Sequence, residues 1–432
     1  MSPDLDVAVV GAGIAGLTAA FELQRAGLQV RVYEAAEQVG GRMATARTHG
    51  FQVDTGAEQI SPRGYQATWE LLHRLGLRAS DVPPIGRPMS VWRDGEPRSG
   101  FASARGLLTG AGLSPRARLE LLRLGESVDA DHPERSALGG TTVAEFARSH
   151  HRDLHDYLLQ PAASFFFWDT ARSSAAALLG LQRAVGDAAA WRTYRDGMDV
   201  PCLRMAACLD VRTGQPVREV VDDGSGARLR IGDDVVSARQ VLLCVPAPIA
   251  AELHANPPAE EAEFLGACTF TCALKVGLPL DAPLELPGRP YLLVTPRAEE
   301  DVLAGVVFDD VKNPACVPPG KGLLTAYTNT GTTRELFAAG DDEVTSRVAA
   351  AVSRYLPGFT HRGGLVHRHR NALPECTPAA LAALPRFRTR PIGPVDYAGD
   401  WTILRPHSEG AVRTAALAAS RTLSRLGSPL PV

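Results

Sequence analysis

The chain has 432 residues, enough for two folding units, with 45% hydrophobic and 22% charged residues, as is ordinary for a globular protein. Its formal net charge of −3 argues against a nucleic-acid-binding surface. No apolar run reaches the roughly 18 residues that a membrane helix needs, and the seven cysteines form no C-x-x-C pair. With no signal peptide before the first strand, we expect a reduced, cytoplasmic protein without a transmembrane segment or a nucleic-acid partner.

The first 34 residues carry a nucleotide-binding pattern. A buried parallel strand is predicted at 7–10, a helix at 17–25 and a second strand at 30–33. Between the first strand and the helix, Gly11, Gly13 and Gly16 have G-x-G-x-x-G spacing. These glycines permit a tight turn, a close approach of pyrophosphate and close packing of helix on strand. Glu34, at the end of the second strand, is placed to accept hydrogen bonds from the ribose of an adenine nucleotide.

A second phosphate-facing turn follows at Gly40, Gly41 and Arg42. A nicotinamide enzyme does not need this turn. With Glu34 it forms the pattern E-x5-G-G-R, followed by Phe51-Gln52-Val53-Asp54-Thr55-Gly56-Ala57. Here the sequence resembles the flavin-containing amine oxidase superfamily, which includes protoporphyrinogen oxidase and phytoene desaturase relatives. The resemblance implies that the first motif holds FAD and that the loop at Gly56 and Ala57 passes beside the flavin ring.

The C-terminal region extends the resemblance. A strand ending at Gly399-Asp400 precedes Ser408-Glu409-Gly410-Ala411-Val412, similar to the family signature A-G-D…S-x-E-G-A-V, although Thr414 and Ala415 replace the usual Ser-Gly. It implies that Asp400 contacts the ribityl or phosphate region and that the final helix points its N-terminus at the flavin. The cofactor-binding residues expected are Gly11, Gly13, Ala15, Gly16, Glu34, Gly41, Arg42, Gly56, Ala57, Val217, Gly399, Asp400, Glu409, Gly410 and Ala411.

The expected fold class is α/β, with a discontinuous Rossmann-like FAD-binding domain and an inserted α+β substrate domain. We assign residues 1–80, 191–262 and 386–432 to the FAD-binding domain. Residues 81–190 form the helical part of the substrate domain, and 263–385 its sheet part. Val217 falls where the family pairs its backbone with adenine.

The substrate half is less defined, and we name Glu58, Lys275 and His407 as candidate catalytic residues. Many family members carry a lysine near Lys275 that holds a water at the flavin, but a solvent-facing strand lysine is the alternative. Glu58 follows the flavin-side loop and is either a satisfied loop acid or an acid–base group. His407 stands where the family places one ring of an amine-binding aromatic pair, and no aromatic is present near Ala372 for the other.

Two further patterns bear on the site. Phe165 to Trp168 are four consecutive aromatic residues, which form either a buried hinge or an apolar substrate wall. Cys376 is only two residues before Pro378, closer than in relatives that bind flavin covalently, so we expect non-covalent FAD. His367 and His369 share a strand face without a third ligand, so we expect no metal site.

The leading hypothesis is an FAD-dependent oxidase or dehydrogenase of amine oxidase type. It would oxidise a C–N or C–C bond of a bulky small molecule, as in secondary metabolism, and pass electrons to oxygen or another acceptor. A desaturase like the protoporphyrinogen or phytoene enzymes, a redox-neutral FAD isomerase and an FAD-binding protein without turnover are the alternatives. The sequence leaves the substrate, the acceptor and the oligomeric state open.

Overall fold

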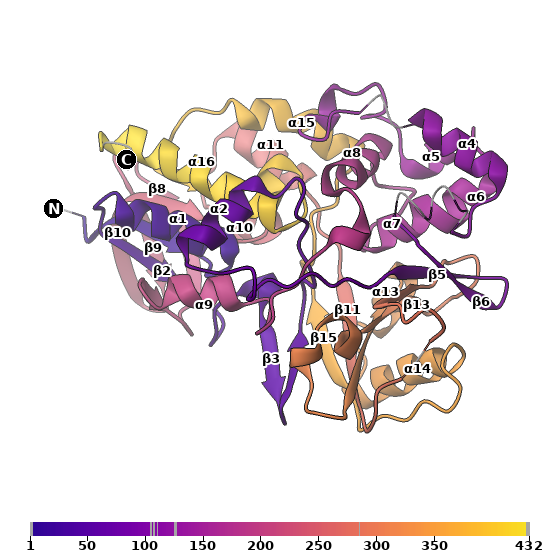
Figure 1. Ribbon diagram of the computed structural model, residues 1–432. Helices are drawn as coiled ribbons and strands as arrows, with labels where there is room; N and C mark the ends of the chain where they lie inside the picture. The colour runs from indigo at the N-terminus through magenta and orange to yellow at the C-terminus, as the bar shows by residue number, and fades with distance from the viewer. Residues whose placement is uncertain are drawn as a thin grey trace.

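The computed structural model describes residues 3–103, 106, 109, 111–124, 128–284 and 286–428. Two seven-stranded sheets organise these residues (Figure 1). Both chain ends lie beside the first sheet, and the second sheet lies below a group of helices on the opposite side of the molecule. Within the described residues, no helix is both long enough and apolar enough to cross a membrane.

The first sheet is built on the nucleotide-binding pattern. Its strands, in spatial order, are β7 (Asp210–Arg212), β2 (Val30–Tyr33), β1 (Leu5–Val10), β10 (Asp234–Leu243), β9 (Ala227–Ile231) and β8 (Val217–Asp222). A seventh strand, β16 (Val395–Tyr397), also pairs with β10. Strands β7, β2, β1, β10 and β16 run parallel, whereas β8 and β9 form an antiparallel extension. Segments from both ends and the middle of the chain therefore meet in one sheet.

Alternation along β1 buries both faces of this sheet. Val7 and Val9 pack in one core cluster with helices α1 (Ile14–Arg25) and α16 (Ser408–Leu426). Ala8 and Val10 point to the other face, into a cluster that includes α10 (Ala247–Leu253), α11 (Ala259–Ala267) and α15 (Pro378–Arg388). The sheet is thus the middle layer of a three-layer unit, as parallel sheets require.

The second sheet has the strand order β15 (Leu365–His369), β11 (Ala273–Leu280), β14 (Gly322–Thr328), β13 (Leu303–Phe308), β12 (Leu292–Val294), β5 (Met89–Arg93) and β6 (Glu96–Ser99). One face packs on α14 (Asp341–Ser353). The hairpin β5–β6 was not expected in the helical part of the substrate domain. Its alternation is short and ends in the polar sequence Glu96–Ser99, so it lacks an independent hydrophobic signal.

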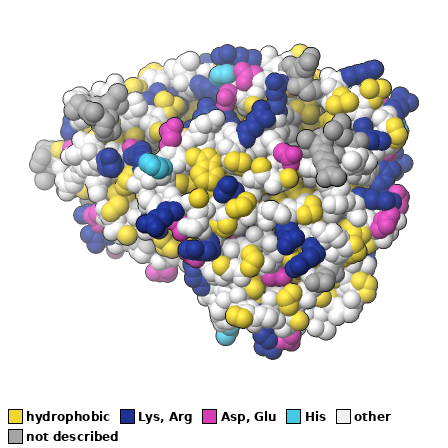
Figure 2. Space-filling view, viewed as in Figure 1, with side chains coloured by type: hydrophobic (Ala, Val, Ile, Leu, Met, Phe, Trp, Pro, Cys, Tyr) yellow, Lys and Arg dark blue, Asp and Glu magenta, His cyan; other side chains and the backbone are white. Residues whose placement is uncertain are grey.

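Short helices complete the molecule. They are α2 (Gln66–Arg74), α4 (Pro115–Leu124), α5 (Val143–Ala147), α6 (Arg152–Leu154), α7 (Gln160–Ser164), α8 (Ala175–Val185), α9 (Val200–Ala206), α12 (Asp309–Lys312) and α13 (Thr330–Leu336). A small hairpin, β3 (Thr45–Thr48) and β4 (Phe51–Asp54), projects between the two sheets (Figure 1). On the face in Figure 2, acidic, basic and hydrophobic side chains are interspersed.

Candidate functional site

A cavity of about 550 Å³ connects the nucleotide-binding turn of the first sheet with the second sheet. One end is lined by residues of the β1–α1 turn and by Glu34. The other end is lined by side chains from β11, β12, β13 and β14, among them Lys275 and Tyr327. The lining thus combines a nucleotide-binding end with a second end that could hold a small molecule.

The three glycines of the first turn have the geometry that a pyrophosphate site needs. Gly11 has φ of 102°, and a Cβ there would lie 2.8 Å from the carbonyl oxygen of Cys244. A Cβ at Gly16 would lie 2.0 Å from the Gly11 carbonyl oxygen, so that glycine serves helix packing and does not line the cavity. A Cβ at Gly13 would meet nothing within 4 Å, so the backbone there is open to a ligand.

The second glycine turn lies beside the first. The Gly40 N–H donates to the Ala12 carbonyl oxygen at 2.9 Å, and Gly13 and Gly40 form an isolated β-bridge. Helix α1 starts at Ile14 without a side-chain cap, which leaves its first N–H groups for an anion. Both turns line the cavity, so backbone donors surround the position where a dinucleotide pyrophosphate would lie.

Glu34 closes the adenine end of the cavity. One carboxylate oxygen accepts from the Ala12 N–H at 2.7 Å, and the other accepts from the Ala36 N–H at 2.9 Å. These bonds fix the carboxylate at the end of β2, where its remaining lone pairs can accept from ribose hydroxyls. Val217, which the resemblance placed near adenine, lies in β8 and is buried outside the cavity lining.

Replacing Glu34 by alanine should weaken FAD binding by about 1.5–3 kcal/mol, the contribution of a hydrogen bond to a charged group. This corresponds to a roughly 10- to 150-fold increase in the dissociation constant. Flavin fluorescence on titrating FAD into the apoprotein measures the change. Glu22→Ala removes a carboxylate of α1 that pairs with Arg74 outside the cavity lining; it is the control and should bind FAD normally. Equal affinity of the Glu34 variant and the parent would contradict the assignment.

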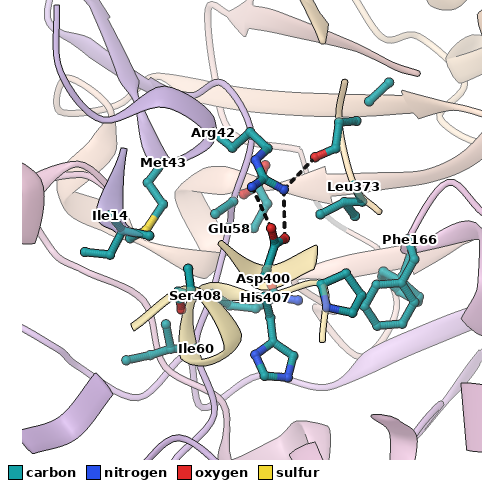
Figure 3. A pocket seen from close by; sticks show the side chains of 18 of the residues that line it. Ile14, Arg42, Met43, Glu58, Ile60, Phe166, Leu373, Asp400, His407 and Ser408 are labelled. Atoms are coloured by element: carbon teal, nitrogen blue, oxygen red, sulfur yellow. Dashed lines mark hydrogen bonds and ion pairs between the residues drawn. The ribbon is translucent and has the colours of Figure 1, made fainter. Parts of the chain in front are cut away.

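Arg42 and Asp400 form a bidentate ion pair in the middle of the cavity (Figure 3). Both hydrogen bonds are 2.8 Å long, and the same guanidinium donates to the Ala372 carbonyl oxygen at 3.1 Å. Arg42 thus joins the second glycine turn to the strand end at Gly399 and to the loop after β15. Arg42 was predicted to bind phosphate, and in this geometry its guanidinium is already committed to Asp400.

The loop after β4 lies directly on Arg42. A Cβ at Gly56 would approach the Arg42 carbonyl oxygen to 2.2 Å, and that oxygen accepts from the Ala57 N–H at 2.8 Å. Only glycine therefore fits at position 56 without displacing the backbone. This contact directs the next residue, Glu58, toward the second sheet.

Glu58 is buried between two lysines. Its Oε1 accepts from Lys275 Nζ at 2.5 Å, and its Oε2 pairs with Lys312 Nζ. Lys275 also donates to the carbonyl oxygens of Asp54 and Gly56, at 2.8 and 2.9 Å. A lysine ammonium has three donors, so all three N–H groups of Lys275 have protein acceptors. The structure therefore brings the two predicted candidates Glu58 and Lys275 into direct contact.

Protonation in this cluster is set by opposing effects. Burial alone would raise the Glu58 pKa, but the charges of Lys275 and Lys312 outweigh it and lower the pKa to about 2. Burial raises the pKa of Asp309 to about 6, against the opposing charge of Lys312. Burial and the Glu58 charge raise the Tyr327 pKa well above its usual value. Near neutral pH, Glu58 is thus a carboxylate and Tyr327 a neutral phenol.

His407 lines the cavity at the N-terminus of α16, separately from the lysine cluster. Its ring stacks on Tyr65 with centroids 4.8 Å apart, and its Nε2 accepts from Arg405 Nε at 3.0 Å. Burial and the neighbouring charge of Arg405 lower the His407 pKa well below its usual value. His407 is therefore a neutral ring that can stack or accept a hydrogen bond.

The start of α16 divides its predicted residues between two surfaces. Ala411 lines the cavity, whereas Glu409 and Gly410 are buried outside its lining. The Glu409 carboxylate accepts from the N–H groups of Ala67 and Thr68 at the start of α2, at 3.2 and 2.8 Å. This carboxylate caps a neighbouring helix, a contact between residues about 340 positions apart that the motif could not reveal.

Aromatic and aliphatic side chains form the wall of the cavity between α7 and the second sheet. They are Met89, Phe101, Phe165, Phe166, Phe167, Trp191, Leu292, Val307 and Tyr327. Trp168 instead is buried and donates from its indole to the Pro374 carbonyl oxygen at 2.9 Å. Three of the four consecutive aromatics thus lie in the cavity wall, and the fourth is buried behind it.

Sequence reasoning missed several residues that complete the site. Lys312, Asp309 and Tyr327 contact or face Glu58, and Tyr65 stacks on His407. The spacing of Asp309 and Lys312 is a helical i,i+3 ion pair and was the one available signal. The remaining contacts join segments far apart in the sequence.

The fold and the cavity define a class of protein: a dinucleotide-binding α/β protein whose cavity runs from the nucleotide-binding turns to a second sheet. The model of the flavin-containing amine oxidoreductase family matches residues 14–423, so the chain belongs to that family. The membership confirms the predicted family, the α/β fold class, FAD as the cofactor, and an FAD-dependent oxidoreductase as the class of enzyme.

Similar sequences match only over parts of their length. A putative flavin-containing monoamine oxidase of Mycobacterium tuberculosis is 43% identical over 89 residues, which cover 21% of this chain and 19% of that protein. Protoporphyrinogen oxidase 2 of Arabidopsis thaliana is 32% identical over 160 residues, covering 36% of this chain and 31% of that protein. The matched segments therefore span at most about a third of these relatives.

Similar structures extend over the whole fold. Putrescine oxidase, in a structure bound to putrescine, has a TM-score of 0.82 at 23% identity, covering 97% of this chain and 99% of that chain. Cyclohexylamine oxidase from Brevibacterium oxydans IH-35A has a TM-score of 0.78 at 21% identity, covering 98% of this chain and 100% of that chain. At this identity the likeness shows the fold.

Proposed function

We propose that the protein is an FAD-dependent oxidase or dehydrogenase for a bulky, largely apolar small molecule. The observation that carries the proposal is the aromatic and aliphatic wall opposite the nucleotide-binding turns. The described residues of both glycine turns, with Glu34 and the start of α1, fit a dinucleotide. When bound, FAD supplies a two-electron acceptor for a hydride from a C–H bond beside nitrogen or from an adjacent C–C pair.

The charges at the substrate end favour a neutral substrate over a small ammonium ion. Among the described residues that line this end of the cavity, Glu58 is the only one with a carboxylate. Both of its oxygens are paired with lysines. A substrate ammonium would have to break one of these ion pairs or lie close to the positive charge of Lys275, which would repel it. The aromatic wall instead favours a substrate with a large apolar surface, because that surface is buried on binding.

The three candidate catalytic residues take different parts in this proposal. Glu58, with a pKa of about 2, is too weakly basic to take a proton efficiently near neutral pH. We assign it an electrostatic function, the fixing of Lys275 at the cavity wall. Lys275 presents a charge there, and His407 provides a flat neutral surface beside Tyr65. An acid–base function of Glu58 would require its separation from one of the two lysines.

Desaturation and redox-neutral isomerisation remain alternatives on the same scaffold, and an apolar pocket suits both. Anaerobic mixing with candidate substrates separates them. An oxidase or dehydrogenase loses its flavin absorbance and an oxidase consumes oxygen on re-aeration, whereas an isomerase turns over without oxygen uptake. A cofactor-binding protein without turnover shows no substrate-dependent change.

Purified protein should be yellow and should release its FAD into the supernatant on acid precipitation. Cys376 is buried outside the cavity lining, with its Sγ directed to the Leu404 carbonyl oxygen at 3.2 Å. Cys244 does line the cavity, but burial raises its pKa to about 12, so the thiol is a poor nucleophile. Absorbance spectra of supernatant and pellet decide the point, and a yellow pellet would refute non-covalent binding.

A further inference from the structure

The chain uses lysine very sparingly, and two of its lysines lie in one buried cluster. Among its 45 basic side chains only three are lysines: Lys275, Lys312 and Lys321. Lys275 and Lys312 have side chains that are 1% exposed, and both contact Glu58. Lys321 is partly exposed and pairs with Asp281 at 3.3 Å. Two of the chain's three lysines therefore contact the same buried carboxylate.

Lys312 does not line the cavity, yet it contacts three carboxylates behind the wall. It pairs with Asp309 at 2.9 Å and Asp54 at 3.5 Å, and it contacts Glu58. Asp54 also accepts from Thr45 Oγ1 at 2.8 Å, and Asp309 accepts from Thr325 Oγ1 at 2.7 Å. These bonds hold the partners of Lys312 in place, and Lys312 in turn holds Glu58.

Other titratable groups surround this cluster on every side. Around Lys312, Lys275 and Glu58 lie on the side of the cavity, Asp54 lies on β4 and Asp309 lies on α12. The remaining groups that interact with Glu58, Lys275 or Lys312 are Tyr291, Cys316, Tyr327, His367 and His369. Burial shifts these phenols and the thiol away from their charged forms, and lowers the pKa of both histidines. Among the groups named here, Glu58 is the carboxylate in contact with both ammonium groups.

We propose that Lys312 is a positioning residue: its ammonium keeps the Glu58 carboxylate ionised and clamped on Lys275, so that the cavity wall presents Lys275 as a fixed charge. Without Lys312, Glu58 would be a buried carboxylate with one cation, in the company of Asp54 and Asp309. Its protonation would then vary with pH, and the charge at the cavity wall would vary with it. The inference rests on FAD as the cofactor but on no particular substrate.

The test measures the midpoint potential of FAD in the holoenzyme, so that no substrate is needed. Reduction by xanthine and xanthine oxidase against a reference dye gives this potential between roughly pH 5.5 and pH 9, a range that includes buried glutamates. The parent and Lys312→Arg should give parallel profiles. Lys312→Met should match the parent at low pH and fall below it at high pH, where Glu58 ionises without its second cation. We expect a difference of about 30 mV, a tenfold change in the two-electron reduction equilibrium.

Lys321→Met is the matched control, because it removes the third lysine from an exposed pair and should leave the profile unchanged. A parallel profile for Lys312→Met would overturn the proposal, because loss of packing alone creates no new pH dependence. If Lys312→Met loses FAD, the double variant with Glu58→Gln should regain it, since Asp54 and Asp309 lose the same cation in both variants and only the charge of Glu58 differs. Failure of the double variant to bind FAD would also overturn the proposal. Either result is independent of whether the enzyme oxidises the substrate class proposed above.

Discussion

Replacement of Glu58 by glutamine should lower the free energy of unfolding by about 3–5 kcal/mol, the usual cost of removing one partner from a buried ion pair. The substitution preserves shape but leaves Lys275 and Lys312 facing each other across a neutral amide. Both ammonium groups are fully buried, so water cannot screen their repulsion. Chemical unfolding of the holoenzyme, followed by flavin fluorescence and circular dichroism, measures the loss.

An exposed carboxylate between two cations offers the matched control. Asp281 pairs with Lys321 and Arg362 but is 58% exposed, so Asp281→Asn should leave the free energy of unfolding nearly unchanged. The double variant Glu58→Gln with Lys275→Met should recover part of the stability lost in the single variant, because Lys312 then keeps Asp54 and Asp309 as partners without facing a second ammonium. A Glu58→Gln protein as stable as the parent would show that Glu58 does not hold the lysines together.

The same substitution should also change how stability depends on pH. The Glu58 pKa is lowered from 4.5 to about 2 in the folded protein, so its contribution is fully present above the unfolded value. That contribution is lost as the pH falls from 4.5 toward 2. The difference in unfolding free energy between the parent and Glu58→Gln should therefore be constant near neutral pH and shrink in acid.

The cofactor half of the site could be predicted because its signals are local. The turn at Gly11–Gly16, the strand end at Glu34 and the turn at Gly40–Arg42 are read within a few residues of sequence. The strand, turn and helix that they predict are present, although α1 starts at Ile14, three residues before the predicted helix. Local backbone geometry determines such a site, and glycine spacing encodes it directly.

The substrate half could be predicted only in part, because long-range pairs make it. Glu58 is 217 residues from Lys275 and 254 from Lys312 in the sequence. Asp400 reaches Arg42 across 358 residues, and this pairing with a carboxylate could not be predicted from the glycine turn that carries Arg42. Neither periodicity nor a motif reports which distant side chains will meet.

Phe167 illustrates how such a site constrains the backbone. It has φ of 54°, in the left-handed region that bulky side chains rarely adopt. Helix α7 ends there in a Schellman motif: the Trp168 N–H donates to the Ala163 carbonyl oxygen, and the Phe167 N–H to that of Ser164, both at 3.0 Å. Glycine is the usual residue at this position. A phenylalanine here carries strain that its side-chain contacts must offset.

Those contacts place the ring in the cavity wall. Phe167 packs in a cluster with Ala273 and Ala372, and its ring centroid lies 6.1 Å from that of Tyr327. Ala372 is the position near which an aromatic of the family's amine-binding pair was expected and is missing. The Phe167 ring, carried by another segment, therefore packs against the space that this small side chain leaves. This contact supports a substrate wall as the reason for phenylalanine in a glycine position.

Truncation of Phe167 should separate the side-chain contribution from the backbone strain. Phe167→Ala should lower the free energy of unfolding by about 3 kcal/mol, at the lower end for a buried phenylalanine because the ring faces a cavity. Phe167→Gly should be more stable than Phe167→Ala by about 1 kcal/mol, since glycine accepts the left-handed conformation. Urea unfolding of both variants measures this order.

Phe165 provides the control, because it also lines the cavity but has φ of −60°. At that position the order should reverse, with alanine more stable than glycine by about 0.5–1 kcal/mol. If the alanine variant is also the more stable one at position 167, the backbone there is not strained. No functional explanation for a phenylalanine at that position is then needed. If glycine is better only at 167, the chain tolerates a strained turn in order to keep an aromatic ring in the wall. Substrates larger than those of the parent should then reduce the flavin of both Phe167 variants.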